Sequence, residues 1–168
     1  MSIWESLNDL SDTDMRTLVS LTTQVLSEAG GLDINADDIS PSRAARQIAP
    51  VLAAADPSIT SSDVQHALED ERSAREIART LLAHVAAIPE LRAEVEARLE
   101  EQRRKLSAPE LLLVTGALLI LAIKLKEIRL DFSIEAVKKK KQLVISFTES
   151  SAVLRDAIAN VIRLYRSN

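Results

Sequence analysis

Apolar residues recur every three or four positions through the first hundred residues, which is the spacing of one face of an α-helix. The first run, from Met15 to Leu26, follows a Ser-Asp-Thr-Asp sequence at 11–14 that supplies an N-cap with an acid three residues on, and it meets two glycines at 30–31. This pattern predicts a helix over about 12–28. The same reasoning predicts three more helices, over 41–55, 62–87 and 89–105.

Two prolines affect the course of the second of these helices, and the last one has a narrow apolar face. Ser40 and Pro41 form an N-cap followed by a first-turn proline, whereas Pro50 stands where we expect it to kink or restart the helix. In the last of the four helices the apolar residues recur every four positions and form a single narrow seam. The seam consists of Leu91, Val95 and Leu99. Together the four helices predict a small bundle.

The apolar spacing changes after residue 106. Ser107 and Glu110 are typical of a capping box, so we expect a helix that continues through the apolar run at 111–123. Apolar and polar residues then alternate in two stretches, which predicts two one-sided strands in an antiparallel hairpin. The alternating apolar residues are Ile128, Leu130, Phe132, Ile134, Leu143, Ile145 and Phe147. A final amphipathic helix is expected from Thr148.

Charge divides the chain at the same place. Residues 1–106 contain 11 basic and 19 acidic side chains, whereas residues 107–168 contain 10 basic and 6 acidic ones. We therefore expect a mostly α fold in two parts. An acidic helical bundle at 1–106 is followed by a small α-β-β-α module at 107–168, which contains a two-stranded antiparallel hairpin.

The residues that several kinds of catalysis require are missing from the sequence. With no Cys, a disulfide scaffold, a thiolate zinc site and a cysteine nucleophile are excluded. His66 and His84 would lie about 27 Å apart on one unbroken helix, too far to share a metal ion. The acidic run Asp33, Asn35 and Asp37 begins like a calcium loop, but the Gly and Glu that such a loop needs are absent. Since the HExxH, GxSxG and Walker motifs are also absent, we expect no enzyme, no cofactor and no metal.

Four consecutive lysines, Lys138 to Lys141, separate the two expected strands. They fit a solvated tip that opposes aggregation, or a contact for an anionic partner such as the acidic first half of a neighbouring subunit or another protein. Nucleic acid or lipid headgroups are further options. Because no aromatic residue is interleaved and the net charge of the chain is -4, sequence-specific nucleic-acid binding is not supported.

The run at 111–123 is the most apolar segment of the chain. As a helix it would be about 20 Å long, whereas the hydrocarbon core of a bilayer is about 30 Å thick. We expect a buried central helix. A groove or oligomer contact, and insertion into a membrane after a conformational change, are the alternatives.

The last third of the chain resembles the small accessory modules that are encoded beside effector proteases and nucleotide-binding ATPases in bacterial conflict systems. The resemblance lies in the stretches LLLVTGALLILAIKLKEIRLDFS, KKKKQLVISF and SAVLRDAIANVIRLY. Such modules pair an apolar helix with a charged hairpin. The resemblance implies an accessory role in a bacterial effector complex, and it assigns no functional residue.

We therefore predict a non-enzymatic protein-protein interaction module, an adaptor or accessory subunit that binds a protein partner or a second copy through the hairpin edge. The residues expected to bind are Ile128, Leu130, Leu143, Ile145, Lys138, Lys139, Lys140 and Lys141. The alternative function is a membrane-active protein that inserts the helix at 111–123, and an enzyme without a recognisable motif is a third. Because residues 1–10 contain two acidic residues and no basic one, we expect no signal peptide and a cytoplasmic location.

Overall fold

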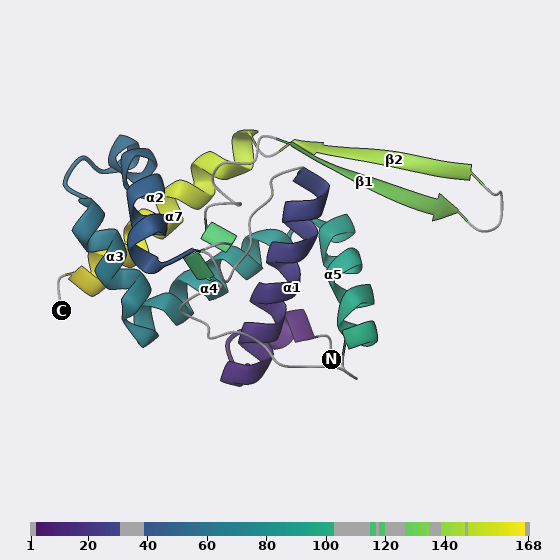
Figure 1. The fold of residues 1–168 in the computed structure, drawn as a ribbon, viewed down its shortest axis with the longest axis horizontal. Helices are drawn as coiled ribbons and strands as arrows, with labels where there is room; N and C mark the ends of the chain where they lie inside the picture. Colours follow the sequence, from purple (N-terminus) through teal and green to yellow (C-terminus); the bar gives the residue numbers. More distant parts are fainter. Residues whose placement is uncertain are drawn as a thin grey trace.

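The computed structural model describes residues 3–30, 39–102, 115–116, 118–119, 127–134, 139–146 and 148–166. A short 3-10 turn, η1 (Ile3–Ser6), precedes six α-helices and two strands. In chain order these are α1 (Asp12–Gly30), α2 (Pro41–Ala55), α3 (Ser61–Glu69), α4 (Glu71–Ala86), α5 (Pro89–Gln102), β1 (Glu127–Ile134), β2 (Lys139–Ser146) and α7 (Thr148–Arg166). The helices gather into one body, and the two strands extend away from it (Figure 1).

The predicted N-terminal caps form at the expected places. The backbone N–H of Asp14 donates to Ser11 Oγ at 3.2 Å, and the backbone N–H of Arg43 donates to Ser40 Oγ at 3.2 Å. Each bond satisfies one of the N–H groups that have no partner inside the first turn of a helix. The predicted starts of α1 and α2 are therefore confirmed. Of the two outcomes expected at Pro50, a kink or a restart, the restart is wrong, because α2 runs through that residue to Ala55.

The prediction of a single helix over 62–87 is also wrong, because the helix is interrupted at Asp70. This residue has an extended backbone, with φ -83 and ψ 125, and it ends α3 and caps α4 at once. Its carboxylate accepts the backbone N–H of Ser73 at 3.0 Å. The hydroxyl of Ser73, which is buried, donates to the backbone oxygen of Ala67 across the break. These bonds replace the helical hydrogen bonds that the break removes.

One apolar core joins helices from both ends of the chain. Leu154, Ile158 and Ile162 of α7 are buried in the same cluster as residues of α1 to α5. The last helix packs against α4, α2 and α3. Amphipathic periodicity predicts which face of a helix is buried, but it carries no information about which neighbour covers that face.

The predicted fold class is therefore wrong. Six helices of the described chain, α7 included, share one core, so the chain is not a helical bundle followed by an α-β-β-α module. The α7 helix, expected as the last element of that module, instead packs against α4, α2 and α3 and completes the helical body. The predicted boundary between 106 and 108 lies outside the described residues.

The two strands form a ladder of their own beside this body. They pair in antiparallel register from Glu127 opposite Ser146 to Ile134 opposite Lys139, and β1 also contacts α1. Three of the four lysines belong to β2 rather than to a loop, which corrects the prediction that the whole run is a hairpin tip. The remaining one, Lys138, lies outside the described residues.

The apolar run at 111–123 is described at four residues only, and all four are buried. They are Thr115, Gly116, Leu118 and Leu119. At these positions the expected buried segment is confirmed. Within the described ranges, no helix has the length and the apolar character that crossing a bilayer requires.

Candidate interaction surface

The register of the ladder brings the four predicted apolar partner residues together. Ile128 lies opposite Ile145, and Leu130 lies opposite Leu143. Residues that face each other in an antiparallel pair occupy the same face of the sheet, and so do residues two positions along a strand. These four residues therefore occupy one face of the ladder, at the end nearer the helical body (Figure 1).

The lysines of β2 occupy the far end of the ladder. Lys139, Lys140 and Lys141 pair with Ile134, Ser133 and Phe132. By the alternation of a strand, Lys139 and Lys141 fall on the same face as Leu143, while Lys140 falls on the other face. The near end of that face is therefore apolar on both strands, whereas the far end combines the two lysines of β2 with Phe132 and Ile134 of β1. The sheet has two strands, so each strand has one outer edge that the ladder itself does not pair.

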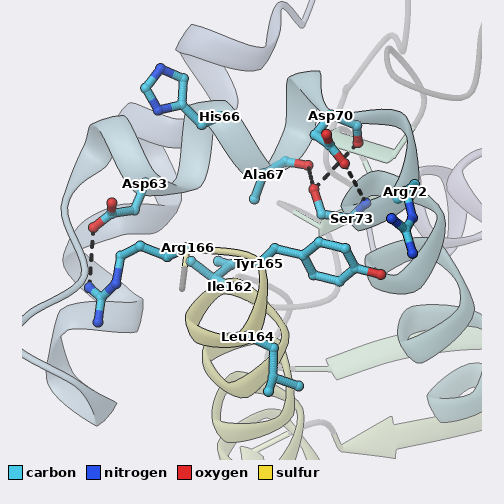
Figure 2. A pocket seen from close by; sticks show the side chains of 10 residues that line it. All are labelled: Asp63, His66, Ala67, Asp70, Arg72, Ser73, Ile162, Leu164, Tyr165 and Arg166. Carbon is cyan, nitrogen blue, oxygen red and sulfur yellow. Dashed lines mark hydrogen bonds and ion pairs between the residues drawn. The ribbon is translucent and has the colours of Figure 1, made fainter. Parts of the chain in front are cut away.

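A pocket of about 640 Å³ lies where α7 ends beside the junction of α3 and α4 (Figure 2). Its lining mixes two carboxylates, two guanidinium groups, an imidazole, a phenol and apolar side chains. The lining residues are Asp63, His66, Ala67, Asp70, Arg72, Ser73, Ile162, Leu164, Tyr165 and Arg166.

One side of the pocket is a tie between the last turn of α7 and the start of α3. Arg166 donates from Nη1 to the backbone oxygen of Ser58 at 3.0 Å, and the same nitrogen lies 3.5 Å from Asp63 Oδ2. Asp63 also accepts the backbone N–H of Thr60 at 2.9 Å, which completes a capping box at the start of α3. The hydrogen bond from the Thr60 backbone lowers the pKa of Asp63, with smaller contributions from the Thr60 hydroxyl and Arg166.

The polar groups of the pocket do not assemble an acid-base site. The Ser73 hydroxyl donates to Ala67, and His66 is exposed at the rim, where it points away from Ser73 (Figure 2). A general acid needs a raised pKa, whereas the pKa of Asp63 is lowered. In the described residues no group of three or more His, Cys, Asp or Glu side chains is placed to hold a metal ion. Four of the polar side chains, those of Asp63, Asp70, Ser73 and Arg166, thus serve the cap, the helix break and the tie.

The outward face of α7 carries two large apolar side chains that lie mostly in solvent. Val153 is 69% exposed and Leu164 is 67% exposed. They are eleven residues apart, which is three turns of an α-helix, so they share one face. Ala157 and Asn160 occupy the same face between them. We call these four residues the outer stripe.

Sequence reasoning missed the outer stripe. Its residues follow one another at intervals of four, three and four, the spacing of a coiled-coil seam, but the face that includes Leu154 and Ile158 is more apolar and dominated the pattern. The spacing alone was the signal that could have revealed a second face.

The narrow apolar seam of α5 is not available at the surface. Its residues, Leu91, Val95 and Leu99, are buried. Their helix, α5, packs against α1 and α4 of the same chain.

Comparison with protein-family models, with curated proteins and with solved structures finds no match to this chain.

Proposed function

We propose that this chain is a non-enzymatic protein-protein interaction module, an adaptor or accessory subunit of a larger complex. The observation that carries the proposal is the outer stripe of α7, where Val153 and Leu164 both lie largely in solvent on one helix face. Burying one such side chain contributes about 1.5–3 kcal/mol, so two on a rigid helix favour a protein surface that covers both. The resemblance of the last third to accessory modules suggests a bacterial effector complex.

The hairpin is the second candidate surface of the same function. Its outer edges offer backbone N–H and C=O groups to an added strand, and its face combines Ile128, Leu130, Leu143 and Ile145 with Lys139 and Lys141. A partner strand with acidic residues toward one end would match the lysines at the far end of β2. The proposal therefore retains the hairpin residues as partner contacts beside the outer stripe.

The membrane-active alternative has less support. It requires the run at 111–123 to leave the protein, whereas Leu118 and Leu119 are fully buried in the core. In a flotation experiment with liposomes that contain anionic lipid, we expect the folded chain to stay unbound and not to rise with the liposomes. Flotation of the chain with those liposomes would favour the alternative.

Photo-crosslinking in the native cell tests the proposed function. A photoreactive amino acid at position 153 should form an adduct with one discrete protein, and Leu164→Asp in the same chain should abolish that adduct because it places a charge in the stripe. The same amino acid at Ala93, an exposed position on α5, is the matched control. Adducts of equal yield from positions 93 and 153, or no adduct from position 153, would contradict the function.

A further inference from the structure

We propose that the outer stripe of α7 binds the outer stripe of a second copy of this chain, with the two helices antiparallel about a two-fold axis. This inference rests on the proposed function, because it names the partner of the same surface. It is built on the spacing of the stripe and on the charges beside it.

The spacing of the stripe makes it complementary to itself when it is reversed. Val153 and Leu164 stand at its two ends, about 16 Å apart along the helix axis, and Ala157 and Asn160 stand between them. In an antiparallel pair Val153 meets Leu164 of the second copy, and this contact occurs twice. The small Ala157 meets Asn160 of the second copy, which leaves room for the amide in the centre of the contact. Large apolar side chains therefore pack at both ends, and a small residue faces a polar one in the middle.

The charges beside the stripe select the antiparallel orientation. Asp156 and Arg163 are seven residues apart, so they lie on the same flank of the stripe. Their side chains are 66% and 46% exposed. In an antiparallel helix pair a flank meets the same flank of the other helix, which places Asp156 within about one turn of Arg163 of the second copy. The two-fold axis produces this pair of opposite charges at both ends of the contact.

A parallel pair lacks this match. In a parallel pair each flank meets the opposite flank of the other helix. The opposite flank of α7 contains Leu154, which is buried, and Val161, which packs against the core of its own chain. Asp156 and Arg163 would then face apolar residues that are already covered.

The groups around Arg163 are compatible with the antiparallel pair. Its Nε lies 3.4 Å from Asp56 Oδ2, and its Nη2 donates to Asn160 Oδ1. Asn160 thus holds the guanidinium beside the stripe, and Asp56 attenuates its charge. Asp156 has a neighbour of its own, since its Oδ1 lies 3.9 Å from Arg155 Nε. We expect the attraction across the pair to be modest and to serve orientation more than affinity.

The size of the contact predicts a weak dimer. A specific interface buries about 1,000 Å² or more, and a helix crossing with two large apolar side chains from each copy falls below that area. The second copy is therefore expected to bind at high protein concentration, or where a larger complex holds two copies close together.

Disulfide trapping tests both the partner and the orientation, because the chain contains no cysteine that would interfere. Val153→Cys and Leu164→Cys are made as separate proteins, and both positions are exposed enough for the change to leave the core intact. Mild oxidation of a mixture of the two should give a mixed disulfide dimer, whereas each protein alone should give far less. A mixture of Val153→Cys with Ala93→Cys measures random collision.

Each outcome of the disulfide trapping supports or overturns the proposed antiparallel pair. A mixed dimer at several times the collision control supports the antiparallel pair. Dimers from each single protein at the same yield as from the mixture would overturn the antiparallel orientation. No dimer above the collision control would overturn the second copy as the partner. In that case an adduct from position 153 to a different protein in the cell would leave the proposed function standing.

The charge reversal Asp156→Lys provides an independent readout. Introduced into both cysteine variants, it should reduce the mixed dimer several-fold at low salt, with less effect at high salt because ions screen exposed charges. The melting temperature of each protein, measured beside it, should stay unchanged because Asp156 is exposed. An undiminished yield at low salt would show that Asp156 and Arg163 do not set the orientation.

Discussion

Arg166 donates a hydrogen bond at 3.0 Å to the backbone oxygen of Ser58, a residue 108 positions earlier in the chain. This bond joins the last turn of α7 to the segment before α3. The same guanidinium makes the ion pair to Asp63 that Figure 2 draws at the edge of the pocket, so Arg166 fastens the end of α7 to the start of α3.

We expect Arg166→Ala to destabilise the fold by about 1 kcal/mol, because it removes a charge-assisted hydrogen bond together with a partly exposed ion pair to Asp63. Urea unfolding should show a lower midpoint at an unchanged slope. Arg92→Ala, at an exposed position on α5, is the control and should leave the midpoint where it is. Equal midpoints for both variants would show that the tie contributes nothing.

Local sequence signals predicted where the helices begin better than they predicted how the helices pack. Ser11 and Ser40 were identified as caps because a hydroxyl followed by a helical apolar pattern satisfies the first N–H groups of a helix. Asp70 was missed because it stands inside a continuous apolar pattern, where an aspartate serves equally as a surface residue of one long helix or as the cap of a second. The choice between them depends on the contact of α3 and α4 with the rest of the body.

The fold class was predicted wrongly for the same kind of reason. Charge and spacing both change near residue 106, which favoured a separate C-terminal module, but neither property records that Ile158 and Ile162 are buried in one cluster with Leu81 and Leu82 of α4. Exposure of Val153 and Leu164 is likewise a result of tertiary packing. The candidate surface on α7 therefore required the structure, while the hairpin residues were identified from alternation alone.

The Glu28 and Arg98 pair should make stability depend on acid pH. Arg98 Nη2 lies 2.6 Å from Glu28 Oε2, and the hydrogen bond from Arg98 lowers the pKa of Glu28. The folded state thus binds this proton less readily than the unfolded chain does. Its stabilising contribution is present above the ordinary glutamate pKa of about 4.3 and is lost as the pH falls through the lower pKa of the folded state.

Glu28→Gln should therefore reduce stability near neutral pH by less than about 1 kcal/mol, since the pair is partly exposed. The free energy of unfolding of the variant should also fall less steeply with acid than that of the unaltered chain, between about pH 5 and about pH 3. Chemical denaturation at a series of pH values measures both. Parallel curves for the two proteins would contradict the coupling.

His84 should produce a second pH dependence nearer to neutrality. Burial lowers the pKa of this imidazole below its ordinary value of 6.5. The unfolded chain therefore takes up a proton more readily than the folded one, and stability is lost as the pH falls below about 6.5. In His84→Leu this loss should disappear, because the side chain no longer titrates. Thermal unfolding between about pH 7.5 and about pH 5.5 measures it, and an unchanged slope in the variant would assign the dependence to another group.

Gly116 should accept a side chain only at a cost in stability, because it lies against α2. A Cβ atom at this position would stand 3.1 Å from the Cβ of Ala44, and both atoms are fixed to backbone, so neither can rotate away. Gly116→Ala should therefore cost about 1–3 kcal/mol by overpacking, measured as a lower midpoint of urea unfolding. Ala44→Gly removes the opposing Cβ and costs about 1 kcal/mol by itself, because glycine weakens a helix. Combined, the two changes should cost less than the sum of their separate effects, since the clash is absent from the double variant. Additive costs would mean that this segment and α2 do not pack as closely as the structure places them, and that the core is built differently around residues 115–119.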